Sequence, residues 1–186
     1  ARRNAPPALS ARLGETDFSG SLIPAKVTAG SFSFDGVSAT SGIRGNLEAS
    51  GVNMRDLRED PLYQPLTADF TATLDNGLLD MSGPLRLKAG GLTIADSLAR
   101  INIVSLTGMA AVTSRPLTFE PGGLQPWRLS DRLRGVFTDA RGTLDVSARM
   151  DINSGKITGT GQVAVGDFGF QTTRLGRVQN VNGEVI

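Results

Sequence analysis

The sequence predicts an all-β fold, built as an antiparallel sheet with one continuous apolar face. Three observations lead to this prediction. Two long stretches, residues 67–87 and 141–170, alternate apolar and polar residues with the period of two that is typical of strands. The chain also has 23 glycines in 186 residues and only 5% aromatic residues, a composition typical of many strands joined by frequent turns.

The stretch 141–170 predicts a long β-hairpin. Asn153-Ser154-Gly155 predicts its turn, because Asn and Gly tolerate the positive φ that hairpin turns need. The return strand continues the apolar face past an expected bulge at Gly166. The apolar residues of this hairpin are Leu144, Val146, Ala148, Met150, Ile152, Ile157, Val163, Val165, Phe168 and Phe170.

The stretch 67–87 predicts a second hairpin, which turns at Asp75-Asn76-Gly77. Pro84 has no N–H to donate to a neighbouring strand, so we expect a sheet edge or a bulge there. The apolar residues of this hairpin are Ala68, Phe70, Ala72, Leu74, Leu79, Met81, Leu85 and Leu87. When the sequences of residues 67–94 and 146–170 are aligned at their turns, the apolar positions of one segment fall on those of the other. This predicts a repeated hairpin within a single β-sheet unit spanning residues 1–186.

Shorter elements are expected around these hairpins. Residues 31–34 and 43–49 alternate as strands, and residues 53–58 predict a single helical turn with Asn53 as its N-cap. Residues 101–112 predict one or two strands broken at Gly108.

A connecting loop and a short helix are expected over residues 115–135. The helix begins at Pro126, carries Trp127 and ends at Gly135, because Pro suits a first helical turn and Gly a helix end.

The composition excludes several kinds of chemistry. The chain contains no Cys and no His, which removes thiolate chemistry, the commonest general base and most zinc ligands. Net charge is +1, so nothing indicates binding to nucleic acid. Residues 151–155 resemble only the first half of a calcium loop, and a hairpin turn explains them. We therefore expect no cofactor, no metal and no catalysis, with a carbohydrate-active enzyme using two carboxylates as a remote alternative.

We expect the sequence to be a piece of a longer protein, because its last strand stops at Val185-Ile186 without a tail. No apolar run reaches the roughly 20 residues of a transmembrane helix, and the first residues lack the apolar core of a signal peptide.

The apolar faces have two interpretations: the closed core of a sandwich or solenoid, or a groove left open for apolar chains.

Residues 115–186 resemble a known family. The segments PLTFEPGGLQPWRLSDRLRG, GTLDVSARMDINSGKITGTGQVAVGDFGFQT and LGRVQNVNGEVI resemble the YdbH-like family, which is related to the AsmA and TamB-like proteins of the Gram-negative envelope. This resemblance implies an elongated, curled β-sheet, an open half-barrel of stacked hairpins whose apolar groove carries phospholipids between the inner and outer membranes. The implied protein is periplasmic and anchored in the inner membrane through parts that this sequence lacks. Its implied partners are phospholipid acyl chains, the two membranes and envelope proteins.

The resemblance and the repeat together nominate groove-facing residues. Those in the second of the two repeated hairpins are Leu144, Val146, Met150, Ile152, Ile157, Val163, Val165, Phe168 and Phe170. Those in the first are Phe70, Leu74, Leu79, Met81, Leu85 and Leu87. The expected function is a non-enzymatic segment of a phospholipid conduit, and the alternative is a structural or adhesive module with a closed core and no lipid role.

Overall fold

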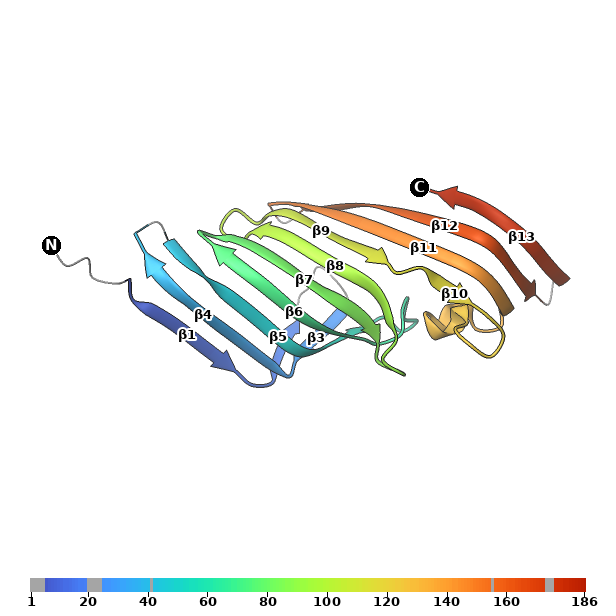
Figure 1. Cartoon of the computed structure of the whole chain (residues 1–186), viewed down its shortest axis with the longest axis horizontal. Coiled ribbons are helices and arrows are strands. Elements are labelled where there is room, and N and C mark those ends of the chain that lie inside the picture. Colours follow the sequence, from blue (N-terminus) through green and yellow to red (C-terminus); the bar gives the residue numbers. More distant parts are fainter. Residues whose placement is uncertain (1–5, 20–24, 41, 155, 173–175) are drawn as a thin grey trace.

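The computed structural model describes residues 6–19, 25–40, 42–154, 156–172 and 176–186. They form one large antiparallel sheet of 13 strands, elongated and curled but not closed (Figure 1), so the predicted fold class is confirmed. The strands are β1 (Ala8–Leu13), β2 (Thr16–Ser19), β3 (Ala25–Ala29), β4 (Ser31–Ala39), β5 (Gly42–Asp56), β6 (Leu66–Asp75), β7 (Leu78–Leu87), β8 (Thr93–Asn102), β9 (Thr107–Ser114), β10 (Leu117–Phe119), β11 (Thr138–Asn153), β12 (Lys156–Thr172) and β13 (Gly176–Val185).

The strands follow one another across the sheet in nearly the order of the chain. The order is β1-β4-β5-β6-β7-β8-β9-β11-β12-β13, while β3 pairs with the end of β5 and β10 pairs with the start of β11. Both hairpins that the sequence predicts are present, as β6–β7 and β11–β12. The second extends further toward its N-terminus than the predicted boundary, because β11 already begins at Thr138.

Tight turns join the strands along one side of the sheet, here called the turn edge (residues 75–78, 102–107 and 153–156). Asn76 and Gly77 have φ of 51° and 85°, and Ser154 has φ of 49°, as the turn predictions require; Gly155 lies outside the described residues. Backbone hydrogen bonds connect successive turns. The N–H of Asn76 donates to Ile43 O at 3.0 Å, and that of Ile103 donates to Gly77 O at 2.8 Å.

The opposite side of the sheet, here called the loop edge, carries the longer connections (residues 57–65, 88–92 and 115–137). β5 bends there at a bulge between Ala49 and Val52, where Gly51 has φ of 61° and donates its N–H to Asp69 Oδ1 at 3.0 Å. This hydrogen bond is the main cause that lowers the pKa of Asp69. Beyond the bend, β5 pairs with β6 on one side and with β3 on the other.

The helical turn predicted at residues 53–58 is wrong. Asn53 lies inside β5, directly opposite Thr67 of β6 and Thr28 of β3. Backbone pairing from two sides therefore overrides the capping signal of this Asn. One other local prediction needs adjustment, because the chain breaks between β8 and β9 at residues 103–106 rather than at Gly108. Pro84 lies in an interior strand, and of the two alternatives expected there the bulge is present, as a register shift between Leu85 and Arg86.

The predicted short helix is two 3-10 turns, η1 (Pro126–Arg128) and η2 (Asp131–Leu133). Ser130 separates them, because its φ of −151° and ψ of 128° are those of extended backbone. Pro126 begins η1 and Gly135, with φ of 75°, follows η2, as predicted. The expected bulge near Gly166 is confirmed, since the register of β12 against β13 shifts between Val165 and Phe168.

Gly83 and Gly161 have different surroundings in the sheet, so we expect replacement by alanine to have opposite effects at the two positions. A Cβ at Gly83 would collide with the carbonyl oxygen of Asp69 and come within 2.7 Å of Phe70 Cδ1, whereas a Cβ at Gly161 would meet only Ser147 O at 3.7 Å. We expect Gly83→Ala to lower the free energy of unfolding by about 1–3 kcal/mol through overpacking. Gly161→Ala, the matched control, should be neutral or slightly stabilising. Urea denaturation measures both, and equal stability of the two variants would contradict this packing.

Asp56 organises the first long loop of the loop edge. Its buried carboxylate accepts hydrogen bonds from the N–H groups of Leu62 at 2.8 Å and Arg58 at 3.0 Å, and pairs with the Arg58 guanidinium at 3.2 Å. These hydrogen bonds, the one from Leu62 first, lower the pKa of Asp56 below its usual range.

A lowered pKa stabilises the fold above the unfolded-state value of about 3.9, and this contribution disappears as the pH falls through the folded-state pKa. We therefore expect Asp56→Asn to lower Tm at pH 7 and to flatten the fall of Tm below about pH 4. Thermal unfolding followed by circular dichroism at several pH values measures this. Glu59→Gln, in the same loop, is the control, and an unchanged pH profile in Asp56→Asn would contradict the assignment.

Candidate functional site

Apolar residues lie in register across the inner face of the sheet. Residues directly opposite each other on paired strands point to the same face, so the strand register defines rows that cross the sheet. One row crosses eight strands without a polar residue. Its members are Phe34, Leu47, Ala72, Met81, Ala99, Ala110, Met150 and Gly159.

The row next to it, toward the turn edge, is also apolar over the same eight strands. Its members are Gly36, Gly45, Leu74, Leu79, Ile101, Gly108, Ile152 and Ile157. The Phe34 ring covers the glycine pair at one end of this row, since a Cβ at Gly45 would come within 2.6 Å of the ring. Together the two rows make a continuous apolar surface along the curl of the sheet.

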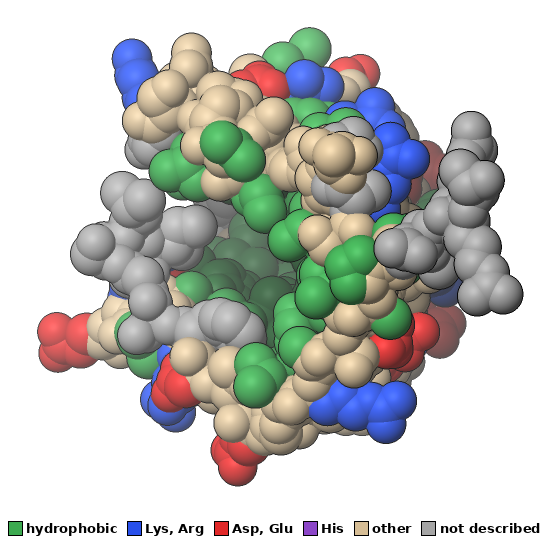
Figure 2. Space-filling model, turned by 90° about the vertical axis from the view of Figure 1, so that its left-hand side faces the viewer, with side chains coloured by type: hydrophobic (Ala, Val, Ile, Leu, Met, Phe, Trp, Pro, Cys, Tyr) green, Lys and Arg blue, Asp and Glu red, His purple; other side chains and the backbone are tan. Residues whose placement is uncertain are grey.

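This apolar surface is hollowed and open. Seen along the molecule from the end of β1, hydrophobic side chains line the interior of the curled sheet (Figure 2). Met150, Ile157 and Val163 are 37%, 39% and 38% exposed. The accessible surface of 11988 Å² exceeds the roughly 8,500 Å² expected of a compact 19.5-kDa protein. We call this open apolar surface the trough.

The hairpin β2–β3 covers part of the trough near the loop edge. Ala29 of β3 packs into a buried cluster with Val52, Ala68, Leu85 and Ala95, all on the inner face. The three alanines let the hairpin lie close to the sheet. Leu85, one of the residues nominated as groove-facing, is consequently only 8% exposed. Leu87, also nominated, is only 3% exposed and lies beside a hollow that Pro65 and Trp127 also line. Both leucines are covered and do not belong to the open surface.

The segment with β10 and the two 3-10 turns covers the trough at a second place. Leu117, Phe119 and Ala140 form its buried centre, and Phe168 packs edge-on against Phe119 at 5.7 Å between ring centroids. The ring of Phe170 likewise meets that of Phe137 at 4.8 Å. Phe168 and Phe170, nominated as groove-facing, therefore lie on the inner face but contact this segment.

A buried glutamine fixes this covering segment to β11. Gln125 Nε2 donates to Ala140 O at 3.0 Å and to Glu120 O at 2.8 Å, while its Oε1 accepts from the N–H of Ala140 at 2.9 Å. All of its buried polar atoms are thereby satisfied. The sequence analysis missed Gln125, and no local pattern marks it, because its partners come from segments that only folding brings together.

The remaining nominated residues lie in register on the inner face, partly or largely accessible. Leu144 is partly covered by the segment with β10, and Phe70 borders the core beneath β3. The others, which line the open part of the trough, are Leu74, Leu79, Met81, Val146, Met150, Ile152, Ile157, Val163 and Val165. Sequence reasoning missed the small inner-face residues of β8 and β9, Ala99 and Ala110, because their alternation is interrupted by Leu98 and Ala111 on the outer face.

The outer face of the sheet is polar and dominated by ion pairs between neighbouring segments. Arg100 binds Asp80 through two hydrogen bonds of 2.6 and 3.1 Å, and Arg115 binds Asp96 through two of 3.1 Å. In each pair the arginine hydrogen bond is the main cause that lowers the pKa of the carboxyl group. These exposed pairs align strands and keep the outer face wet, and each adds little stability.

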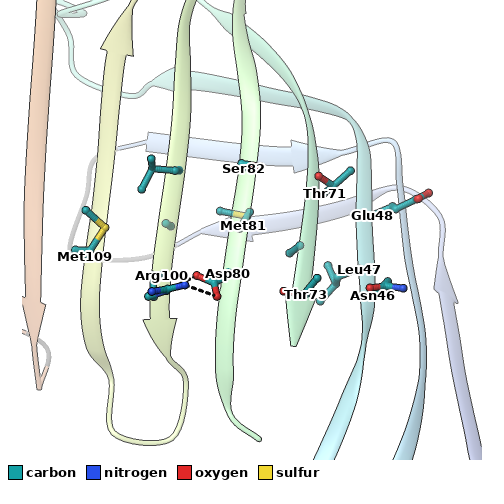
Figure 3. A pocket seen from close by; sticks show the side chains of 13 residues that line it. Asn46, Leu47, Glu48, Thr71, Thr73, Asp80, Met81, Ser82, Arg100 and Met109 are labelled. Atoms are coloured by element: carbon teal, nitrogen blue, oxygen red, sulfur yellow. Dashed lines mark hydrogen bonds and ion pairs between the residues drawn. The ribbon is translucent and has the colours of Figure 1, made fainter. Parts of the chain in front are cut away.

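A shallow depression of about 800 Å³ lies on this outer face (Figure 3). Its walls include Thr71, Ser82, Glu48 and the Asp80–Arg100 pair, which come from alternate positions of β5 to β8. The carboxylate of Asp80 is held by Arg100 through two hydrogen bonds. The Asp80–Arg100 pair is an outer-face ion pair like the others, and we regard the depression as the saddle of a twisted sheet.

Clusters of three or more acidic residues that could hold a metal ion are absent from the part of the chain that the structure describes. Within that part, no helix is long and apolar enough to cross a membrane. The chain matches no protein-family model, no curated protein and no solved structure with which it was compared.

The trough and its covered part predict different responses to a buried charge. Leu85→Asp would place a carboxylate inside the packed core beneath β3, at a cost of several kcal/mol, so we expect an unfolded or insoluble protein. Val163→Asp would place the same carboxylate on the open trough, where it stays hydrated, so we expect less than about 1 kcal/mol of destabilisation. Urea denaturation of both variants measures this, and unfolding of Val163→Asp would show that the trough is a closed core.

Proposed function

We propose that this chain is a segment of a non-enzymatic conduit that moves phospholipids between the inner and outer membranes of a Gram-negative envelope. The observation that supports this most is the open trough, an apolar inner face that the protein's own side chains leave accessible. In an ordinary soluble domain such a large apolar surface would be buried, and its exposure indicates an interaction with an apolar ligand.

The chemistry of the trough suits acyl chains. Its open part is lined by aliphatic side chains, methionines and glycines, while the ion pairs of the sheet lie on the opposite face. Burying an acyl chain contributes about 0.8 kcal/mol per CH₂ without any directed polar contact. On such a surface the affinity for a lipid depends on the length of its acyl chains. Because no polar contact fixes its position, the lipid can move along the trough.

The resemblance of residues 115–186 to the YdbH-like family adds the cellular setting to this proposal. The full-length protein is then periplasmic and anchored in the inner membrane, and it reaches both membranes through other parts of the chain, with envelope proteins as further partners. The competing function is a structural or adhesive module without a lipid role. An open trough favours the conduit, because an adhesive module gains nothing from an accessible apolar interior.

Site-specific photo-crosslinking tests the proposal. We expect a photoreactive amino acid at Met150 or Met81, on the inner face, to crosslink to phospholipid when the protein is incubated with vesicles of phosphatidylethanolamine and phosphatidylglycerol. The same amino acid at Arg149 or Ser82, one residue away on the outer face, is the matched control and should give little or no adduct. Mass spectrometry of the intact protein measures the adducts. Equal crosslinking from both faces, or none from the inner face, would contradict the conduit.

A further inference from the structure

Large aliphatic side chains are exposed along the turn edge of the sheet. Tight turns are usually built from Gly, Pro, Asn, Asp and Ser, each of which favours a turn conformation. The turn at residues 102–107 instead contains three large aliphatic residues, and the side chain at its tip, Val104, is 82% exposed. Exposed aliphatic side chains also lie on the neighbouring turns. We call the whole set the aliphatic ridge, and its members are Ile43, Leu78, Ile103, Val104 and Leu106.

The aliphatic ridge is continuous from one turn to the next. The N–H of Asn76 donates to Ile43 O and that of Ile103 donates to Gly77 O, so these turns lie side by side. A Cβ at Gly77 would come within 3.0 Å of Val104 Cγ2, which places the Val104 side chain against the neighbouring turn. The exposed side chains of successive turns therefore form one surface.

The aliphatic ridge borders the trough. The apolar row nearest the turn edge contains Leu79 and Ile101, which lie opposite each other on β7 and β8. The hydrogen bond from Ile103 to Gly77 O continues the same register beyond the end of β8. Because side chains alternate along a strand, this register places Ile103 on the same face as Ile101. The apolar surface thus continues along β8 from the trough onto the ridge.

The tip of the aliphatic ridge has its backbone donors satisfied within the protein. Asn102 Oδ1 accepts hydrogen bonds from the N–H groups of Val104 at 3.0 Å and Ser105 at 2.9 Å. The N–H of Ile103 is used in the hydrogen bond to the neighbouring turn, at 2.8 Å. An N–H group without a partner costs free energy when it leaves water. These three successive residues can therefore enter an apolar environment without that cost.

Leu106 holds a backbone conformation that large side chains rarely adopt. Its φ of 53° lies in the left-handed region, which Gly and Asn occupy far more readily than Leu. Strain of this kind is typical of positions that a function requires. A Gly at this position would relieve the strain but would remove an aliphatic side chain from the ridge.

Shape and charge favour a lipid surface over a second protein as the partner of the aliphatic ridge. Val104 projects from the tip of a turn, and a stable protein interface would need a surface of complementary shape, whereas lipids are fluid and close around a projecting side chain. The three turns of the turn edge contain only two charged residues, Asp75 and Lys156. Asp75 binds Arg44 at 2.7 Å, so its charge is compensated before it approaches an anionic membrane.

We propose that the aliphatic ridge inserts into the head-group region of a phospholipid leaflet and that acyl chains pass from the leaflet over Ile103 into the trough. This inference rests on the proposed function. It adds to that function a direct membrane contact of this segment, beside the contacts that other parts of the chain make, and it names the turn edge as the side from which lipid enters.

A single fluorescent label tests the insertion. The chain has no cysteine, so Val104→Cys carries an environment-sensitive nitrobenzoxadiazole label at one position only. When vesicles of phosphatidylethanolamine and phosphatidylglycerol are added, we expect its emission to rise about twofold and to shift to shorter wavelength, because the label leaves water. The matched control carries the same label at Ser82→Cys, on the outer face, and its emission should not change. An unchanged label at position 104 would overturn the proposal.

Vesicle flotation tests which side chains make the contact. We expect Ile103→Ser/Val104→Ser to weaken binding to the same vesicles about tenfold, because it removes apolar area that the leaflet buries. The matched control, Leu98→Ser/Val136→Ser, removes two aliphatic side chains that are exposed elsewhere and should bind as the unmodified protein does. Circular dichroism and Tm verify the folding of both variants. An equal loss of binding in both would overturn the assignment to the ridge.

Three further results separate the aliphatic ridge from the conduit and from self-association. Diheptanoyl-phosphatidylglycerol below its critical micelle concentration reaches the trough without a bilayer. Crosslinking of this lipid from Met150, with a label at position 104 that ignores vesicles, would overturn the ridge and keep the conduit. A responding label without any lipid crosslinking from Met150 would overturn both the conduit and the passage from the ridge into the trough. A dimer in analytical ultracentrifugation that Ile103→Ser/Val104→Ser abolishes would assign the ridge to a second copy of the chain instead.

Discussion

The register of the antiparallel ladder is the constraint on which the rest of this structure depends. Because side chains alternate between the two faces of a strand, a slip of one residue in any strand would exchange its apolar and polar faces. The row from Phe34 to Gly159 remains apolar across eight strands only because every turn along the turn edge preserves the register. Positive φ at Asn76, Gly77 and Ser154 fixes these turns, so local backbone chemistry at a few positions maintains an apolar surface much longer than any one strand.

Two small packed regions provide the core that the open trough lacks. One holds Leu85 and Val52 beneath β3, and the other holds Phe119 and Ala140 beneath the segment with the 3-10 turns. Both regions lie near the loop edge, and in both a segment of the chain folds back over the inner face of the sheet. The protein thus separates the surface that stabilises it from the surface it leaves accessible, which lets the trough stay open without loss of the fold.

The sequence predicted the all-β class, both long hairpins, their turns and the bulge near Gly166, because each depends on period-two alternation or on turn residues close together in the chain. It also placed the nominated residues on one face. It did not predict that β3 would cover Leu85, that Leu87 would be buried, or that Phe168 and Phe170 would pack against Phe119 and Phe137. Those contacts join segments far apart in the chain, and an apolar residue that is covered has the same local pattern as one that is open. Asn53 shows the reverse case, where a clear local signal gives way to strand pairing on both sides.

The two long sides of the trough also differ in how they are held, and this has a mechanical consequence. Along the turn edge, backbone hydrogen bonds connect successive turns, as from Asn76 to Ile43 and from Ser154 to Leu106. They extend the hydrogen bonding of the strand ladder to the edge of the trough. Along the loop edge, the N–H of Lys88 donates to Pro65 O and that of Gln64 donates to Leu129 O, both at 2.9 Å. Arg132 also binds Asp60, through an ion pair at 2.9 Å and a hydrogen bond of 2.6 Å to its carbonyl oxygen. The turn edge is therefore held by backbone hydrogen bonds between short turns, whereas the loop edge also depends on an exposed ion pair between longer segments. Because salt screens an exposed ion pair, high ionic strength should loosen the loop edge more than the turn edge.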